Sequence, residues 1–404
     1  MELIENQASS KTPVQAVGRE GCFVRVLRTA EEVEEVREFW TSTHGTRDSD
    51  IEILLSLCRS ETERRKPHVF VLYRNGEPVA LITGSIVQKR LHLGVGYLRL
   101  FRPLALVLEV PYGGLRGDAS VENCESLVRG IIHSLKRGEA EVAILDNLDI
   151  ESAFFRCARR LPTLLCRDHI LKANPLRMRM LPASVELLQK ELSGNERHNF
   201  RRVAKALERD FPGQLVLERF KEPVDLDRIV LEVEAIAKTT WQRGLGVGFE
   251  PSLAVISKLR TAAERGWLRI YILRLGGKPC AFWVGALYQN VFYGDFTGYD
   301  PLYLKYAPGM YMLARMLEEF CASNVAAWDF ASGNEDFKKR FGNRVQQVAE
   351  LHIYAPSFKG LSLAAMKLIV TAVHEALRWL LDRLKLTQRV KRIWRQTPEV
   401  KGTA

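Results

Sequence analysis

Two stretches of the chain repeat each other and decide its fold. Residues 71–87 read VLYRNGEPVALITGSIV, and residues 272–288 read ILRLGGKPCAFWVGALY. They align without gaps, so that Asn75 in the first stretch meets Gly276 in the second. In each copy an apolar strand reaches an Asn-Gly or Gly-Gly pair, and a second apolar strand follows. Because such pairs adopt positive φ readily, both copies predict a β-hairpin with a type I′ turn.

The surroundings of the two hairpins repeat as well. Each hairpin follows a charged segment with helical character, and each is followed by a further strand, a helix and another strand. This order predicts an α/β (α+β) protein of two similar tandem domains, with mixed sheets flanked by helices. We place the first domain at residues 20–180, the second at 181–355, and a basic amphipathic helical tail at 356–404.

Composition and spacing exclude several classes of protein. The chain has 404 residues, 47% hydrophobic and 26% charged, which is typical of a globular protein. Its seven cysteines are dispersed without a CxxC pair, so we expect reduced thiols in a cytoplasmic protein. The eight histidines form no HExxH or HxH motif, so we expect no metal site. The N-terminal segment contains no apolar stretch typical of a secretory signal.

The positive charge is concentrated in the tail. The net charge is +11, and residues 356–404 hold ten Lys or Arg and three Asp or Glu. The main body is therefore only weakly basic, and we expect no nucleic-acid partner. Between residues 361 and 395 apolar residues alternate with cations, which is typical of a helix at an anionic membrane surface. A helix packed on the protein body explains the pattern equally well. Peripheral attachment to the inner face of the membrane stays open.

Four segments of the second half resemble a known family. They are TGYDPLYLKYAPGMYML at 297–313, WDFASGNEDFKKRFGN at 328–343, ERHNFRRVAKALERD at 196–210 and KTTWQRGLG at 238–246. Together they resemble the CelD/BcsL-like branch of the acetyltransferase (GNAT) superfamily, which is related to the two-domain FemABX transferases. The resemblance covers roughly residues 185–355, and the doubled layout extends it to the first half.

The resemblance implies two tandem GNAT-like domains and a transferase activity. The protein would move an acyl group from an acyl-CoA co-substrate to an amine or hydroxyl acceptor, without a metal. Members of this branch are associated with cell-envelope and exopolysaccharide biosynthesis. The first half has EVPYGGLRGDAS at 109–120 in place of the Tyr-rich loop, so we expect a degenerate copy that shapes the cleft.

The donor site is predicted where the Tyr-rich loop becomes a helix. Proline at the first helical position suits a helix that begins at Pro308. The free N–H groups of Gly309, Met310 and Tyr311 would then face the phosphates of the donor. The superfamily's usual glycine-rich loop is reduced here to Gly309 alone, and an ordinary helix start is the alternative interpretation.

Acyl transfer also needs a base for the acceptor and an acid for the leaving thiolate. Tyr306 is our candidate acid, because a phenol is protonated at neutral pH, and Tyr303 is the alternate. Asp295 and Asp329 are candidate bases. Lys338 completes the family motif and would bind a negatively charged group or pair with Asp329. The alternatives are tyrosines packed in the core and a structural ion pair.

Further residues are candidates for substrate binding. The helix at 196–210 carries a cationic stripe that includes Arg201, which would hold an acidic acceptor or a phosphate unless it is merely a solvated face. Trp241 and Tyr299 are aromatic candidates from the family segments. Asp300 and Glu335 are further candidate bases, and Asp300 is also a candidate for substrate binding, although an Asp before a proline also suits a turn cap.

Three hypotheses remain open from the sequence. An acyl-CoA N- or O-acyltransferase is favoured by the Tyr-rich loop and the block that follows it. A Fem-like aminoacyl or peptidyl transferase that uses tRNA is suggested by the doubled domain plan. A non-catalytic scaffold at the membrane periphery is suggested by the basic tail.

Overall fold

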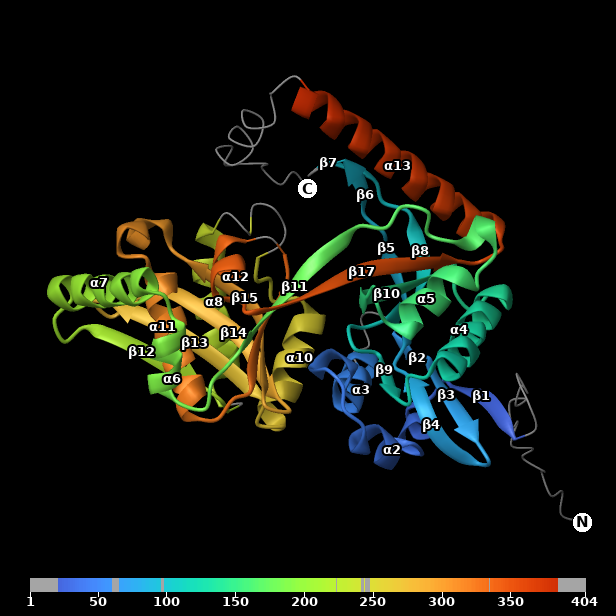
Figure 1. Ribbon diagram of the computed structural model, residues 1–404, viewed down its shortest axis with the longest axis horizontal. Coiled ribbons are helices and arrows are strands. Elements are labelled where there is room, and N and C mark those ends of the chain that lie inside the picture. The colour runs from blue at the N-terminus through green and yellow to red at the C-terminus, as the bar shows by residue number, and fades with distance from the viewer. Residues whose placement is uncertain are drawn as a thin grey trace, which may run out of the picture.

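The computed structural model describes residues 21–59, 65–95, 98–222, 224–240, 243, 248–333 and 335–383. These residues form two lobes joined by long strands that cross between them (Figure 1). The first lobe is built mainly from the first half of the chain and the second lobe from the second half. A long C-terminal helix, α13 (Phe358–Arg383), lies along the outside of the first lobe.

The first half begins with a strand and three short helices, followed by a hairpin. These are β1 (Cys22–Leu27), α1 (Ala30–Glu34), α2 (Arg37–Ser42), the 3₁₀ turn η1 (Arg47–Ser49), α3 (Ile51–Arg59), β2 (Lys66–Pro67), β3 (Val69–Arg74) and β4 (Glu77–Ile82). The rest comprises β5 (Ser85–Arg90), β6 (Leu93–Val95), β7 (Leu98–Phe101), β8 (Leu104–Val110), β9 (Leu115–Gly117), α4 (Val121–Lys136), β10 (Val142–Asp149), α5 (Ala153–Arg160), η2 (Leu164–Cys166) and β11 (Ala173–Met180).

The second half repeats this order after two additional helices. They are α6 (Val185–Glu191) and α7 (Gly194–Asp210), followed by β12 (Leu215–Phe220), α8 (Leu226–Thr239), α10 (Leu253–Glu264), β13 (Leu268–Leu275), β14 (Lys278–Tyr288) and β15 (Val291–Tyr299). The half ends with η3 (Pro301–Tyr306), α11 (Pro308–Ala322), β16 (Ala327–Ser332), α12 (Asp336–Phe341) and β17 (Arg344–Tyr354).

The predicted hairpins are present. The residues at positions 75, 76, 276 and 277 all have positive φ, between 53° and 89°, as type I′ turns require. The fold class predicted from the repeat, with mixed sheets flanked by helices, is confirmed. Helix α7 begins after Ser193, whose side chain and that of Glu196 form a reciprocal capping box.

The two halves exchange their last strands. An 11-stranded sheet runs through both lobes in the order β12-β13-β14-β15-β16-β11-β17-β10-β8-β5-β2. Strand β11, which ends the first half, pairs with β16 of the second half, and β17 pairs in turn with β10 of the first half. The exchange makes one continuous sheet, so the two lobes are held together by backbone hydrogen bonds.

Equivalent helices of the two halves meet between the lobes. The hydroxyl of Ser56 on α3 lies 2.6 Å from that of Ser257 on α10. The two residues are 201 positions apart, which is the offset of the sequence repeat. A contact between equivalent positions is what two-fold pseudo-symmetry predicts.

Separate apolar clusters cover the two faces of the second half's sheet. Helices α6, α7 and α11 pack on one face, around Phe292 and Trp328. Helices α8 and α10 pack on the other face, around Phe282 and Val284. Strands β15 and β16 therefore lie between two helical layers, and this position shapes the candidate site.

Candidate active site

Strands β15 and β16 begin as neighbours and then separate. They pair in parallel only from Val291 to Tyr293, opposite Ala327 to Asp329. Beyond these residues β15 pairs with β14, and β16 pairs with β11. The strands therefore open after Tyr293 and Asp329, and in a sheet such an opening lets a ligand reach backbone groups that have no ladder partner.

Asp329 is a buried carboxyl at this opening. Only 3% of its surface is exposed. One carboxyl oxygen accepts the backbone N–H of Ala331 at 2.6 Å. Burial raises its pKa to about 6, and the positive charges of Arg47 and Lys338 offset this only in part. A carboxyl with this pKa is ionised at neutral pH and can accept a proton in a reaction.

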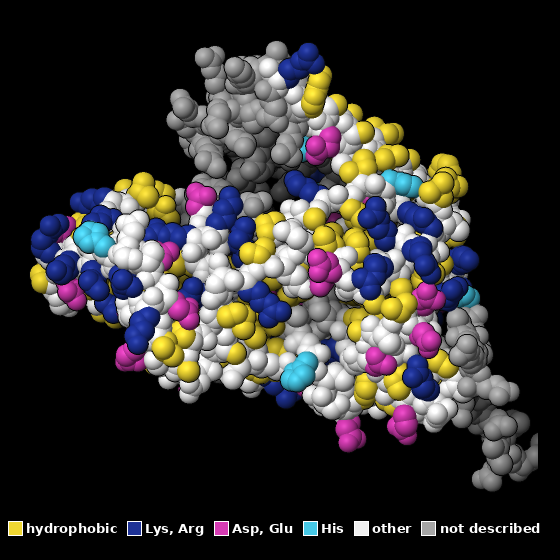
Figure 2. Space-filling model, viewed as in Figure 1, with side chains coloured by type: hydrophobic (Ala, Val, Ile, Leu, Met, Phe, Trp, Pro, Cys, Tyr) yellow, Lys and Arg dark blue, Asp and Glu magenta, His cyan; other side chains and the backbone are white. Residues whose placement is uncertain are grey.

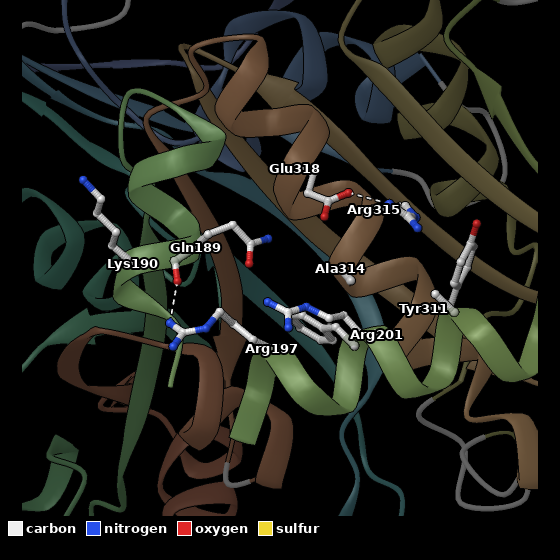
Figure 3. A pocket seen from close by; sticks show the side chains of 10 residues that line it. Gln189, Lys190, Arg197, Arg201, Tyr311, Ala314, Arg315 and Glu318 are labelled. Atoms are coloured by element: carbon white, nitrogen blue, oxygen red, sulfur yellow. Dashed lines mark hydrogen bonds and ion pairs between the residues drawn. The ribbon is translucent and has the colours of Figure 1, made fainter. Parts of the chain in front are cut away.

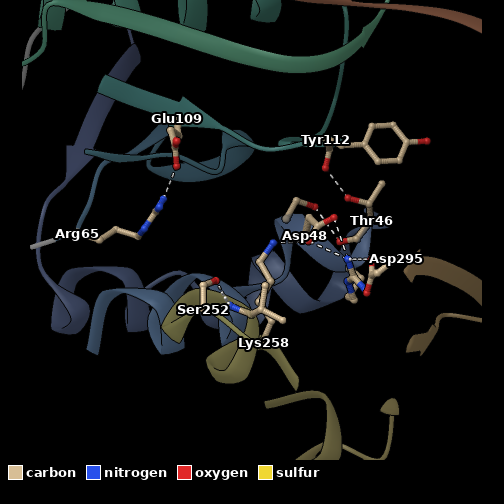
Figure 4. Close-up of polar contacts among 11 residues, drawn as sticks. Thr46, Asp48, Arg65, Glu109, Tyr112, Ser252, Lys258 and Asp295 are labelled. Carbon is tan, nitrogen blue, oxygen red and sulfur yellow. Dashed lines mark hydrogen bonds and ion pairs between the residues drawn. The ribbon is translucent and has the colours of Figure 1, made fainter. Parts of the chain in front are cut away.

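A buried arginine of the first half reaches the same region. Arg47, in η1, forms a bidentate ion pair with Asp295 of β15, at 2.5 and 2.8 Å. Its guanidinium also donates to Asp48 at 3.0 Å, and Lys258 on α10 donates to Asp48 at 3.0 Å. Figure 4 shows Asp48, Lys258 and Asp295 converging from different segments. The chain of alternating charges therefore ties the two halves together beside Asp329.

The ion pairs keep both Asp48 and Arg47 charged despite their burial. Burial disfavours the charge of Asp48, but Arg47 and Lys258 outweigh it and lower the pKa of Asp48. Burial also disfavours the charge of Arg47, yet Asp295 and Asp48 raise its pKa. Because both oxygens of Asp295 are held by one guanidinium, Asp329 is better placed than Asp295 to act as a base.

Two phenols flank Asp329. Tyr293 is its partner across the parallel ladder, so their side chains share one face of the sheet. Tyr112 comes from the first half, and its carbonyl accepts a hydrogen bond from Thr46 at 2.5 Å (Figure 4). Burial, and then the negative charge of Asp329, raise the pKa of both phenols. They stay protonated at neutral pH and are available as hydrogen-bond donors.

The predicted ion pair between Lys338 and Asp329 is replaced by another. Lys338 is 9% exposed, and its ammonium contacts Glu335 at 3.2 Å and donates to the carbonyl of Ser332 at 3.0 Å. Both partners lie within six residues of Lys338, so its short loop and helix satisfy it locally. Lys338 therefore acts on Asp329 through its charge and not through a direct contact.

The predicted phosphate site at the start of α11 also needs correction. The helix does begin at Pro308, as predicted. However, Ala307 adopts a left-handed conformation, and its carbonyl accepts the N–H groups of Met310 and Tyr311, at 3.0 and 3.3 Å. Of the three predicted donors, the N–H of Gly309 is left to meet an anion.

Other predicted residues lie around η3 and the start of α11. Tyr306 packs edge-on against Phe211, with ring centroids 5.2 Å apart, at the end of α7. The structure therefore does not bring Tyr306 to Asp329. Asp300 caps η3 by accepting the N–H of Leu302 at 2.9 Å, as its turn-cap alternative predicts.

Tyr299 is the last residue of β15. Its ring lies beside Gly309, where an added β-carbon would be 4.0 Å from it. Trp241 lies outside the described residues.

A cationic groove of about 640 Å³ lies between α6, α7 and α11. Arg197 donates to the carbonyls of Gln189 and Leu192, and Arg315 pairs with Glu318 at 2.8 Å. Figure 3 shows Arg201 facing α11 across this groove. Figure 2 shows further basic side chains over the outer side of α7.

Three cations that line the groove have no ion-pair partner among the residues that the structure describes: Lys190, Arg197 and Arg201. Arg197 is engaged by the backbone carbonyls of Gln189 and Leu192, which leaves Lys190 and Arg201 for a ligand. Cations without a protein partner are available to an anionic ligand. Arg201 therefore belongs to this groove and not to the group around Asp329.

The sequence pattern does not predict Arg47, Asp48, Tyr112 or Lys258 as site residues. Three of them belong to the half that is expected only to shape the cleft. The one available signal is the polar run TRDSD at 46–50, which directly precedes an apolar helix. Within the described parts of the chain, no group of three His, Cys, Asp or Glu side chains could hold a metal ion.

Comparisons with known proteins bear on the domain class and on the fold. Residues 194–339 match the family model described as an acetyltransferase (GNAT) domain. No curated protein sequence matches the chain.

Two solved structures are similar in fold. L-PGS from Bacillus licheniformis is 13% identical, with a TM-score of 0.51 over 87% of this chain and 99% of that one. FemX is 10% identical, with a TM-score of 0.52 over 80% of this chain and 96% of that one. At these identities the likeness concerns the fold, and it extends over both halves.

Proposed function

We propose that the protein transfers an acyl group from an acyl-CoA thioester to an amine or hydroxyl acceptor. The observation that carries the proposal is Asp329, a buried carboxyl with a pKa raised to about 6, at the point where β15 and β16 separate. The match of residues 194–339 to the GNAT domain supports acyl transfer as the reaction class. The acceptor's place in cell-envelope or exopolysaccharide biosynthesis stays a prediction from the sequence resemblance.

In the proposed reaction Asp329 acts as the general base. The acceptor nitrogen or oxygen bonds to the acyl carbon and gives its proton to Asp329. The carbon–sulfur bond breaks, and the thiolate leaves with its electron pair and is then protonated. Arg47 and Asp295 would fix the wall of the acceptor side, because their bidentate pair joins the two halves there. Tyr293 and Tyr112 offer hydroxyl donors on the same side. These two tyrosines replace Tyr306 as our candidates for the acid that protonates the thiolate.

We place the phosphates of the donor in the groove between α7 and α11. Lys190 and Arg201 supply unpaired positive charge there, and α11 lines the groove with Tyr311, Ala314, Arg315 and Glu318. Gly309 lies at the start of the same helix and can offer its N–H group. The groove takes over the phosphate-binding role predicted for the amides of Met310 and Tyr311.

Donor binding tests both the function and the groove. We expect acetyl-CoA or a longer acyl-CoA to bind in calorimetric titrations, and Arg201→Ala to weaken binding about 5- to 10-fold by removing one charge-assisted contact. Arg202→Ala is the matched control, because Arg202 contacts Asn199 and does not line the groove. If no acyl-CoA binds at millimolar concentration, acyl transfer from CoA is wrong.

An aminoacyl-tRNA donor is the second candidate, since the unpaired cations of the groove suit any polyanion. The same calorimetric experiment, repeated with tRNA at two salt concentrations, separates the two donors. Binding of tRNA that falls steeply with salt, together with no binding of acyl-CoA, would favour the second candidate.

We also propose that α13 attaches the protein to an anionic membrane surface. Residues Phe358–Leu377 have a mean hydropathy of 1.4, and 17% of the most apolar stretch is buried. Figure 2 shows hydrophobic side chains along this helix. Lys367 pairs with Asp168 at 2.7 Å, which fixes the helix on the protein and favours a peripheral over a spanning position. Its exposed apolar residues are Phe358, Leu368, Ile369, Val373, Leu377 and Trp379.

Vesicle sedimentation tests the attachment. The protein should sediment with vesicles that contain phosphatidylglycerol and much less with pure phosphatidylcholine, because cations follow the helix in the sequence. Ile369→Asp should reduce the bound fraction several-fold, since Ile369 is 62% exposed on α13. Leu231→Asp, at a similarly exposed leucine of α8, should bind as the unaltered protein does. Equal binding by both variants would contradict this role of α13.

A further inference from the structure

Two buried tryptophans lie at the opening between β15 and β16 without hydrogen-bond acceptors. Trp283, on β14, is 5% exposed, and Trp328, on β16, is fully buried. Among the described residues, neither indole nitrogen has a hydrogen-bond partner. A buried N–H group without an acceptor is unfavourable, and in native structures it calls for a ligand, water or functional explanation.

Both indole nitrogens border the same spot. A β-carbon added to Gly294 would lie 2.8 Å from the Nε1 of Trp283 and 3.0 Å from that of Trp328. The rings themselves meet edge to face, with centroids 4.7 Å apart. Glycine at position 294 therefore keeps open a space into which two N–H donors can point, and any larger residue would fill it.

This spot lies where the strands diverge. Gly294 is the first residue of β15 after the last pair that β15 makes with β16. Phe337 of α12 closes one side of the opening, with its ring centroid 6.0 Å from that of Trp283. A narrow ligand entering between the strands would therefore meet the two donors before it reached the far face.

The tryptophans and Asp329 face opposite sides of the sheet. Trp328 immediately precedes Asp329, and successive residues of a strand point to opposite faces. Trp328 packs among Phe292, Phe320 and Phe330 under α11, whereas Asp329 shares its face with Tyr293. A reacting carbonyl at the opening could thus be held from the α11 side and attacked from the side of Asp329.

We propose that the indole N–H groups of Trp283 and Trp328 together bind the carbonyl oxygen of the acyl group that is transferred. A carbonyl oxygen accepts two hydrogen bonds, which matches two donors that border one spot. When the acceptor attacks the acyl carbon, the carbonyl electrons move onto this oxygen, and both donors stabilise the negative charge until the carbon–sulfur bond breaks. The inference rests on the proposed acyl transfer, and it assigns a role to two residues outside the phosphate groove.

Indole N–H resonances of protein labelled with ¹⁵N-tryptophan test the proposal without any variant. Acetyl-CoA should shift the resonances of Trp283 and Trp328 downfield, whereas CoA, which lacks the acetyl carbonyl, should not. Trp40 is the internal reference, because its buried indole already donates to the carbonyl of Ser49 at 3.0 Å. Equal shifts with CoA would place a pantetheine amide at the spot and overturn the assignment. Unmoved resonances with bound acetyl-CoA would also overturn it, since a structural water would then satisfy the donors.

Kinetics of Trp328→Phe and Trp283→Phe provide the second readout. Each change removes one donor and keeps an aromatic ring, so kcat should fall about 10²-fold while the dissociation constant of acetyl-CoA stays within about threefold. If a variant fails to fold, the resonances of the unaltered protein decide alone. An unchanged kcat in both folded variants refutes the inference and leaves the proposed function standing, whereas absence of any acyl-CoA binding refutes the function itself.

Discussion

Replacing Asp329 with Asn is expected to lower kcat about 10²- to 10⁴-fold without disturbing the fold, as is typical when a general base is lost. The amide has the same shape, and its oxygen can still accept the N–H group of Ala331, which Asp329 holds at 2.6 Å. What the substitution removes is the ability to take a proton from the acceptor. Steady-state kinetics with the acyl donor identified by calorimetry measures the effect.

Asp146 provides a matched control for this substitution. It is a carboxyl of β10 whose pKa is also raised to about 6, by burial and then by the charges of Glu350 and Asp48. Asp146→Asn therefore removes a similar charge from the neighbourhood, and we expect less than a tenfold change in kcat. A large loss with Asp146→Asn and a small one with Asp329→Asn would transfer the role of base to Asp146.

The pH dependence follows from the raised pKa of Asp329. Only the ionised carboxylate can accept a proton, so kcat/KM should rise through about pH 6 and then level off. This rise of kcat/KM with pH should be absent from the residual activity of Asp329→Asn. If the rise persists unchanged in this variant, another group titrates.

Stability should change with pH in the opposite direction. The native protein binds the Asp329 proton more tightly than the unfolded chain does, because the pKa rises from 3.8 to about 6 on folding. This contribution to stability is fully present below about pH 4 and is lost as the pH rises through about 6. The ionised carboxylate then costs up to about 3 kcal/mol. Asp329→Asn should therefore be at least as stable as the unaltered protein at pH 7.5, in denaturant unfolding.

Local signals in the sequence predict much of the fold. The glycine pairs at the tips of the repeated hairpins require positive φ, and this need is visible without tertiary information. The capping box of α7 depends on Ser193 and Glu196, three residues apart. Such features are set by short-range geometry, so a single sequence contains them.

The strand exchange and the first half's part in the site depend on long-range contacts. Strands β11 and β17 have no local feature that distinguishes one partner strand from another, so their pairing is decided by the packing of both halves. Arg47 is a single arginine in a polar run, 248 residues from Asp295. The aromatic residues on either side of Asp329 are visible in the sequence. Its raised pKa is not, because it depends on burial against distant segments.

Replacing Arg47 with Met is expected to lower the free energy of unfolding by about 3 kcal/mol, at the low end of the cost of breaking a buried ion pair. The side chain of Arg47 is 8% exposed, and its removal leaves Asp295 without its only ion-pair partner among the described residues. The effect stays at the low end because the side chain of Asp295 is 26% exposed and can gain some hydration. Asp48 loses less, since it keeps Lys258 at 3.0 Å. Denaturant unfolding followed by circular dichroism measures the change.

Two further variants separate the loss of the arginine from the cost of the orphaned charge. Arg25→Met removes an arginine whose side chain is 33% exposed and pairs with the exposed Glu35, so it should cost less than about 1 kcal/mol. Arg47→Met combined with Asp295→Asn should be more stable than Arg47→Met alone, because no uncompensated carboxylate remains. If the double variant is instead the less stable of the two, Asp295 has a stabilising contact other than Arg47. The ion pair would then not be the link that holds η1 of the first half against β15.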